Sequence, residues 1–437
     1  MVRITRATTY LVGNPWKNWL LLRLDTDQPG LYGLGEGTLN AFGRTVEAAI
    51  HELAPRYEGM DPFQVETIVQ RMTRDLYSDG GQIHGNAVAA VEEACWDIIG
   101  KETGRPVYDL IGGRYHESLP VYANGWYTGE RTPDAFAARA AEVVGMGYRA
   151  LKLDPFGAAW RVMPPAERAL SLEIVRRVRE AVGPEVQIMI EGHSRFSVAE
   201  AVWVGERLAE VEPAWFEEPT AHQKISSTAE VARRVPVPVA TGESFTSPQQ
   251  FAELLAHDTV HILQPDPGNM GGIWRTRQVC AMADAHYAVV APHQAQGPIC
   301  TAVCVQLGAA IPNLMVQELF DEFNVDWERE IVLPPRWRCA TGGSSCQTIQ
   351  DSASTSTGAR SRSTHTRRRT SCPCSRPVGS DASATREVVD DRRARRRPGD
   401  RDTLRRERSG RPSVADAGRR RAARGRRRWS AGARTRR

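Results

Sequence analysis

Short apolar runs alternate with longer amphipathic segments along residues 119–320. Pro165–Val182, Val198–Val211 and Gly272–Ala285 carry apolar residues at the spacing of one helix face. A strand followed by a helix is the repeating unit of a parallel sheet, and eight such units close into a barrel. The pattern therefore predicts an α/β fold whose main domain is a TIM-like (β/α) barrel. The expected strands are residues 121–126, 150–153, 187–190, 214–216, 239–241, 261–264, 289–291 and 314–316.

A different pattern precedes the barrel. Strand-like runs at residues 4–12 and 18–26 are followed by helical patterns, of which Gly85–Lys101 is the strongest. Strands followed by helices, without alternation, are typical of an α+β domain. We expect such a domain over residues 1–118.

The chain changes character after Pro335. Residues 336–437 contain 29 arginines, no lysine and 9 acidic residues, whereas the first 335 residues hold 28 basic and 43 acidic ones. With few aliphatic residues and no apolar periodicity, this Arg-rich tail cannot bury enough surface to offset chain entropy, so we expect it to be disordered. A polybasic tail is typical of a nucleic-acid-binding arm, which is one alternative.

The absence of lysine favours another origin for the tail. Arginine with small residues and no lysine is what GC-rich DNA encodes when it is read out of frame. GC-rich codons for residues 336–356, read two bases downstream, permit a strand, a turn and a Gly-rich loop. We therefore favour a frameshifted tail, with residues 321–335 as a truncated return segment, and we do not expect nucleic acid as a partner.

Nothing in the sequence indicates export or a membrane. The N-terminus lacks the apolar stretch and cleavage site of a signal peptide, and no apolar run reaches the about 18–20 residues of a membrane helix. Four cysteines lie in helical apolar patterns and are expected in the core: Cys95, Cys280, Cys300 and Cys304. The prediction is a cytoplasmic protein without a membrane partner.

Three glutamates end three successive predicted strands. Glu191, Glu217 and Glu243 are each 26 residues apart, so they should converge on the barrel mouth. Three carboxylates repel one another in a dry pocket unless a cation compensates them. Oxygen-only ligands suit Mg²⁺, which we predict as the cofactor. The neighbouring Glu218 should point away by strand alternation.

Two predicted strand ends carry an acid–base pair. Asp266 should accept a hydrogen bond from His293, which fixes the tautomer and leaves the other ring nitrogen as a base. His193 follows Glu191 by two residues and would reach the same mouth if the strand stays extended, as a second acid or base. Lys152 and Asp154 share one face of another strand, where the lysine would orient a substrate carboxylate.

These residues resemble the enolase superfamily, and within it the mandelate racemase subgroup. The likeness covers about residues 1–335 and includes the helix motif A-x-x-E-x-A-x-W-D-I-x-G-K at Ala89–Lys101. It implies an enolase-type barrel with an N-terminal capping domain and a Mg²⁺ ion that stabilises charge when the proton α to a carboxylate is removed. The metal ligands carry over onto Glu191, Glu217 and Glu243, and the dyad onto Asp266 and His293.

One departure from the subgroup narrows the reaction. Its racemases carry a second catalytic lysine at the position of Asp154, which disfavours a two-base racemase here. The extra histidine, His193, looks like the pattern of galactonate-dehydratase-like sugar-acid dehydratases. That resemblance implies loss of the 3-hydroxyl of an aldonate and a 2-keto-3-deoxy acid as product.

Two alternatives stay open: a cycloisomerase or epimerase of a sugar acid on the same fold, and an inactive product of a frameshifted gene. For the latter, we expect this chain to be less stable than a version with the frame restored. The resemblance also implies a homo-oligomer. Candidate substrate-binding residues are Asp154, Glu318, Arg195 and Trp16, with Lys17 and Asn18 in the same first loop and Trp126 in the wall.

Overall fold

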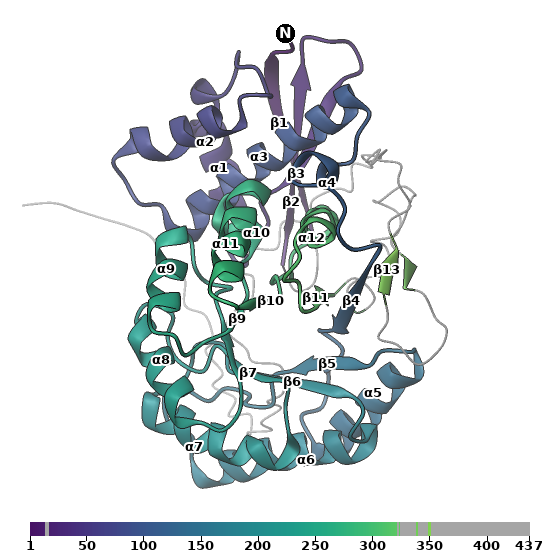
Figure 1. The fold of residues 1–437 in the computed structure, drawn as a ribbon, viewed down its shortest axis with the longest axis vertical. Coiled ribbons are helices and arrows are strands. Elements are labelled where there is room, and N and C mark those ends of the chain that lie inside the picture. The colour runs from purple at the N-terminus through teal and green to yellow at the C-terminus, as the bar shows by residue number, and fades with distance from the viewer. Residues whose placement is uncertain (14–16, 321–322, 324–337, 340–347, 351–437) are drawn as a thin grey trace, which may run out of the picture. The chain divides into compact units, whose positions relative to one another are not determined.

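The structure, a computed structural model, describes residues 1–13, 17–320, 323, 338–339 and 348–350 (Figure 1). The predicted site residue Trp16 lies outside the described residues. So do nearly all of the expected return segment and most of the Arg-rich tail.

The N-terminal domain joins a three-stranded antiparallel sheet to a long helix, α3. Gly33 and Gly35 in the third strand let this helix pack directly on the sheet, because a Cβ at either position would lie 1.9 Å from a carbonyl oxygen of α3. The helix ends at Thr103, and the capping residue Gly104 follows it with a φ of +66°, which suits glycine. The elements are β1 (Ile4–Val12), β2 (Trp19–Thr26), β3 (Tyr32–Glu36), α1 (Gly43–Glu52), α2 (Val65–Thr73), α3 (Gly81–Thr103) and α4 (Val107–Leu110).

The second domain alternates strands and helices, as the sequence predicts. Helix starts follow local chemistry: Thr132 accepts a hydrogen bond from the Ala135 amide, Ser197 from the Glu200 amide, and Pro165 opens its helix. The strands are β4 (Ser118–Ala123), β5 (Ala150–Leu153), β6 (Gln187–Glu191), β7 (Trp215–Glu217), β8 (Val239–Thr241), β9 (Ile262–Leu263), β10 (Val289–Val290) and β11 (Gln317–Leu319). The helices are α5 (Pro133–Gly145), α6 (Pro165–Val182), α7 (Val198–Leu208), α8 (Ile225–Arg234), α9 (Pro248–Ala256), α10 (Pro267–Met270), α11 (Ile273–Ala285) and α12 (Pro298–Ala310).

The eight strands are parallel and form a closed ring. Neighbours run in the order β10-β9-β8-β7-β6-β5-β4, and β11 pairs with β4. A parallel bridge between Val290 and Leu314 joins β10 to the residues just before β11. The predicted barrel is confirmed, and its helices surround the strands in Figure 1.

Two predicted strands were wrong in position. The first is Ser118–Ala123 and leaves Trp126 outside it, and the last is Gln317–Leu319 rather than 314–316. The apolar run at 314–316 marks a buried segment but does not set its hydrogen-bond register. The polar Gln317 and Glu318 enter the strand because both find hydrogen-bond partners inside the barrel. Gln317 Nε2 donates to the Pro292 carbonyl, and Glu318 Oε1 accepts from Asn124 Nδ2.

The described residues of the tail form two short strands, where the sequence predicts no regular structure. β12 (Arg338–Cys339) and β13 (Thr348–Gln350) pair antiparallel, and β13 pairs antiparallel with β4. Such pairing uses backbone groups, so side-chain composition does not reveal it.

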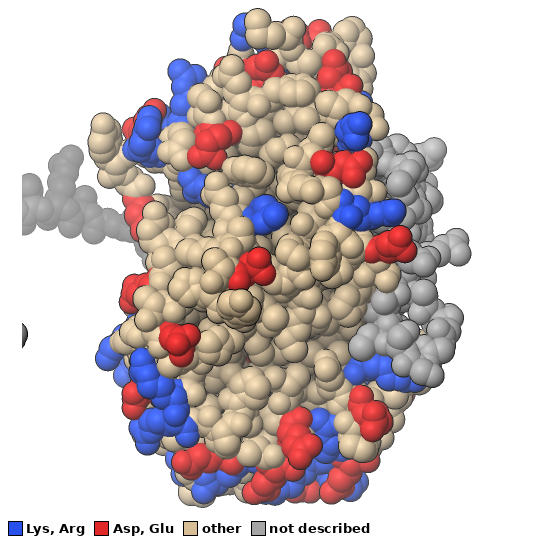
Figure 2. All heavy atoms as spheres, viewed as in Figure 1, with Lys and Arg blue, Asp and Glu red and all other residues tan. Residues whose placement is uncertain are grey.

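Charged side chains of both signs are interspersed on the face in Figure 2, densely over the outer helices α6 and α7. Several form ion pairs there, including Arg176 with Glu210 at 3.0 Å and Arg177 with Asp134 at 2.8 Å. The four cysteines expected in the core are all buried. Among the described residues, no helix is both long and apolar enough to cross a membrane.

Candidate active site

A polar ring lies directly above an apolar ring inside the barrel. The apolar ring takes one residue from each strand or its flank: Tyr122, Ala150, Met189, Trp215, Ala240, Ile262, Ala291 and Val316. Because side chains alternate along a strand, the residue two positions further on faces the same interior. In seven of the eight cases that residue is polar: Asn124, Lys152, Glu191, Glu217, Gln264, His293 and Glu318.

The eighth position is Gly242, and it explains how the third glutamate reaches the site. Its φ of +130° turns the chain at the end of β8, so that the next residue, Glu243, points into the mouth. One carboxylate oxygen from each of Glu191, Glu217 and Glu243 lies within 4.8 Å of the other two. The three glutamates that the sequence spacing singled out therefore lie together in the structure.

This carboxylate cluster fits a divalent cation. Its donors are all oxygens, the set that Mg²⁺ prefers. Oε2 of Glu191 is buried without a hydrogen bond, and its nearest cation is Lys152 Nζ at 3.5 Å. Burial, and then the Glu191 carboxylate, raises the pKa of Glu217, which is the response of acids that lack a sufficient counter-charge.

Lys152 is the cation that the chain itself supplies to the cluster. Its side chain is 2% exposed, and Nζ lies 2.6 Å from Glu217 Oε1 and 2.9 Å from Glu318 Oε1. Burial lowers the pKa of Lys152, but the surrounding carboxylates, Glu217 first, outweigh it and raise the pKa well above its usual value. The lysine is therefore charged at neutral pH.

Asp266 and His293 form the predicted pair. His293 Nδ1 lies 2.6 Å from Asp266 Oδ2, and its other nitrogen, Nε2, faces the cluster at 3.4 Å from Glu243 Oε2. Burial lowers the pKa of His293, but the carboxylates, Glu243 first, outweigh it and raise the pKa to about 10. A cation on the cluster would offset this negative charge and lower the pKa of His293 toward neutral pH.

His193 is held in a way that the sequence did not indicate. β6 ends at Glu191, and His193 has a left-handed backbone with φ of +46°, so the extended chain does not continue. Its ring turns to the end of β5, where Nδ1 lies 2.6 Å from Asp154 Oδ2. Arg195 donates to both oxygens of Asp154, at 2.5 and 3.3 Å. Asp154 therefore supports His193 and Arg195 together.

Two other residues expected at the substrate, Glu318 and Trp126, contact protein groups instead. Glu318 is fully buried and accepts from Asn124 Nδ2 at 2.7 Å and from the Gln294 amide at 2.8 Å, besides Lys152. Trp126 is buried against Tyr127 and Phe136, so it belongs to the core instead of the wall.

Glu218 points away from the cluster, as alternation predicts. Its carboxylate accepts from Ser194, Thr241 and the Gly242 amide, which ties together the loops after β6 and β8.

Sequence reasoning missed several supporting residues. Gln296 Nε2 donates to Asp266 Oδ2 at 2.7 Å, and the Asn269 amide donates to Asp266 Oδ1 at 2.9 Å. Trp215 Nε1 donates to Glu217 Oε2 at 2.8 Å. Only Trp215 carried a usable signal, because it precedes Glu217 by two residues on the same strand face.

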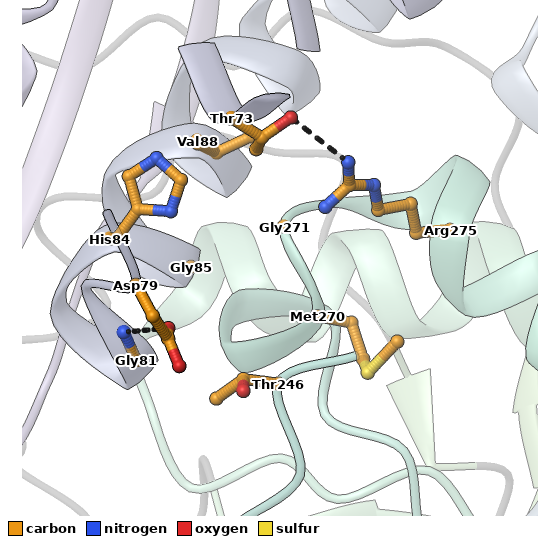
Figure 3. A pocket seen from close by; sticks show the side chains of 10 residues that line it. All are labelled: Thr73, Asp79, Gly81, His84, Gly85, Val88, Thr246, Met270, Gly271 and Arg275. Atoms are coloured by element: carbon orange, nitrogen blue, oxygen red, sulfur yellow. Dashed lines mark hydrogen bonds between the residues drawn. The ribbon is translucent and has the colours of Figure 1, made fainter. Parts of the chain in front are cut away.

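A separate hollow lies where α2 and α3 meet α10 and α11, and it shares no residue with the cluster (Figure 3). Within it, Arg275 donates to Thr73 Oγ1 at 3.3 Å, and Asp79 accepts from the Gly81 amide at 2.9 Å. The hollow gathers no set of carboxylates or histidines comparable to that of the barrel mouth.

Both domains match known families. Residues 15–112 match the mandelate racemase/muconate lactonizing enzyme N-terminal domain, and residues 135–342 match the family described as enolase C-terminal domain-like. A D-galactonate dehydratase of Verminephrobacter eiseniae is 34% identical over 319 residues, which are 72% of this chain and 81% of that protein. A D-gluconate dehydratase of Thermoproteus tenax is 33% identical over 321 residues, 73% of this chain and 65% of that longer protein.

The fold agrees with these matches. A mandelate racemase/muconate lactonizing enzyme from a Sulfitobacter species superposes with a TM-score of 0.72 at 30% identity, covering 76% of this chain and 88% of that one. Its likeness, the two matched domains and the cluster at the barrel mouth lead to one conclusion: the chain belongs to the mandelate racemase/muconate lactonizing enzyme group of the enolase superfamily.

Proposed function

We propose that the protein is a Mg²⁺-dependent sugar-acid dehydratase, which converts an aldonate to a 2-keto-3-deoxy acid. The observation that carries this proposal is the placement of two histidines around the carboxylate cluster. His193 follows β6 and His293 follows β10, and these strands are four places apart in a ring of eight. A substrate between them can meet a base at one carbon and an acid at the next. The relatives named as D-gluconate and D-galactonate dehydratases support the substrate class.

Each histidine suits one half of the reaction. With Nδ1 on Asp266, His293 presents Nε2 toward the cluster, where it removes the proton at C2 of the substrate. With Nδ1 on Asp154, His193 would use its other nitrogen to donate a proton to the departing 3-hydroxyl. The bond between C3 and that oxygen breaks, water leaves, and the resulting enol becomes the 2-keto-3-deoxy acid.

The remaining charges stabilise the substrate carboxylate. Glu191, Glu217 and Glu243 would hold Mg²⁺, which supplies positive charge where negative charge develops as the C2 proton leaves. Lys152 adds a fixed positive charge beside the same cluster. The apolar ring below closes the floor of the site to water.

The test is product formation from a panel of aldonic acids with the full chain and Mg²⁺, detecting 2-keto acids with semicarbazide. We expect one or more acids to give a 2-keto-3-deoxy product. We expect His293→Asn to lower the rate by about 100-fold to 10,000-fold, the usual contribution of a general base. His286→Asn, which changes an exposed histidine, is the matched control and should keep the wild-type rate.

NMR of the products separates this proposal from its alternative on the same fold. An epimerase or cycloisomerase gives a product without a keto-deoxy group. Such a product, or full activity in His293→Asn, would refute the dehydratase proposal.

A further inference from the structure

The loop that carries His293 is held from the other domain. This β10–α12 loop (residues 291–297) runs from the end of β10 to the start of α12, and it also carries Gln296, which donates to Asp266. Glu36, the last residue of β3 in the N-terminal domain, is fully buried at the point where the loop ends.

The Glu36 carboxylate accepts hydrogen bonds from the backbone amides at the start of α12. Its Oε1 lies 2.7 Å from the Gly297 amide, and its Oε2 lies 3.1 Å from the Ile299 amide and 3.0 Å from the Cys300 amide. The first amides of a helix have no partner within it, and their partial positive charge favours a carboxylate. Thr38 donates to Glu36 Oε1 at 2.5 Å and fixes the carboxylate orientation.

The contact is close. A Cβ at position 297 would lie 2.6 Å from Glu36 Oε1, so a larger residue there would displace a carboxylate that four hydrogen bonds hold. A second contact from the same domain holds the loop two residues earlier, because Lys17 Nζ donates to the Ala295 carbonyl at 2.5 Å. The loop has little freedom to move between these anchors and Gln294, whose amide is bound to Glu318.

We propose that Glu36 is a positioning residue for His293. By fixing the start of α12, it sets the end of the β10–α12 loop, and through Gln296 and Asp266 it sets the imidazole against the substrate. This inference rests on the proposed function, in which His293 is the base. Misplacing a catalytic group by about 1 Å can cost about 100-fold in rate, so a buried anchor outside the barrel can control the chemistry.

Glu92 offers a matched control. It is also a buried glutamate of the N-terminal domain, and it accepts the Ile273 amide at 3.0 Å and the Trp274 amide at 2.9 Å at the start of α11. Neither a dyad residue nor a cluster glutamate lies on α11. Glu36→Gln and Glu92→Gln therefore remove comparable inter-domain contacts, because in each an amide NH₂ group faces backbone N–H groups.

The first measurement does not depend on activity. The Nδ1 proton between His293 and Asp266, at a heavy-atom distance of 2.6 Å, should give a low-field proton NMR signal, assigned by its loss in His293→Asn. We expect Glu36→Gln to shift or broaden this signal and Glu92→Gln to leave it as in the wild type. An unchanged signal in folded Glu36→Gln overturns the inference.

The second measurement is kinetic, with a substrate deuterated at C2. In Glu36→Gln we expect kcat to fall about tenfold or more at little change in KM, and the isotope effect on kcat to rise, because proton removal becomes slower than other steps. Equal kcat and isotope effects in the two variants would overturn the inference. If the wild type forms no keto acid while the NMR signal still responds to Glu36→Gln, the proposed function fails and the positioning role stands.

A shorter side chain covers the case in which Glu36→Gln does not fold. Glu36→Asp keeps the charge but withdraws it by one methylene from the three amides. We expect an intermediate loss of kcat with a raised isotope effect. Wild-type kinetics and an unchanged low-field signal in Glu36→Asp would contradict the positioning role.

Discussion

Replacing Lys152 with methionine should destabilise the protein strongly when no divalent cation is present. The change keeps the shape of the side chain but leaves Glu217, Glu318 and Glu191 without the cation that lies 2.6, 2.9 and 3.5 Å from them. At an effective dielectric constant near 20, a contact of about 3 Å contributes roughly 5 kcal/mol before desolvation is counted. Removing one partner of a buried ion pair costs about 3–5 kcal/mol in net terms, and we expect a loss in this range for Lys152→Met.

The sign of the effect follows from the pKa of Lys152. Burial alone lowers that pKa, yet the pKa is raised, so attraction by the carboxylates exceeds the cost of desolvating the ammonium group. The folded state therefore gains from the charged lysine, and neutral methionine forfeits that gain.

The assay is urea unfolding in EDTA, followed by tryptophan fluorescence, with Lys101→Met as the matched control. Lys101 makes an equally short ion pair of 2.6 Å with Asp97, but its side chain is 20% exposed. We expect about 1 kcal/mol or less for that pair, as for other partly exposed pairs. Mg²⁺ at a hundredfold excess over its Kd should then stabilise Lys152→Met by about 2.7 kcal/mol. A loss in Lys152→Met no larger than in Lys101→Met would refute the reasoning.

Three further changes test other parts of the site. Glu217→Gln should weaken Mg²⁺ binding at least about tenfold by calorimetry, because it removes one of three charged ligands. Glu185→Gln, which changes an exposed glutamate, is the control and should leave the affinity unchanged. Equal affinities in the two variants would argue against the cluster as the metal site. Asp154→Asn should slow loss of a 3-hydroxyl more than loss of fluoride from the 3-deoxy-3-fluoro analogue, because fluoride leaves without a proton from His193; equal slowing would contradict the acid role. Burial raises the pKa of Glu92 from 4.5 to about 7, so between these pH values the folded state binds a proton that the unfolded state has lost. The stability of the wild type relative to Glu92→Gln should therefore fall by up to about 3 kcal/mol as pH rises from 4.5 through 7. A difference in unfolding free energy that does not change with pH would show that the pKa shift is absent.

The barrel could be predicted because each strand shows its buried face as a short apolar run. The exact register could not, and β11 shows why. Gln317 and Glu318 look like the start of a loop, but Lys152, Asn124 and the Pro292 carbonyl bind them inside the barrel. The burial of such polar residues can be predicted only when their hydrogen-bond partners are known, and those partners lie far away in the sequence.

The candidate site was predictable where strand alternation alone decides the direction of a side chain. Glu191 and Glu217 occupy equivalent positions above Met189 and Trp215, so equal spacing sufficed for them. The path of His193 was not predictable, because it depends on a left-handed backbone at a residue other than glycine. Its contact with Asp154 arises from that turn.

The role of the N-terminal domain is the part that sequence patterns conceal most completely. Glu36 ends a strand and Glu92 lies within a helix, and neither stands near a dyad residue in the sequence. Each accepts hydrogen bonds from the first amides of a barrel helix, Glu36 from those of α12 and Glu92 from those of α11, and only α12 follows the loop that carries His293. A barrel without the N-terminal domain would expose these amides and release the loop that carries His293. On this proposal the N-terminal domain is part of what forms the site, and the geometry of the proposed base, His293, depends on the contact between the two domains as much as on the barrel that carries it.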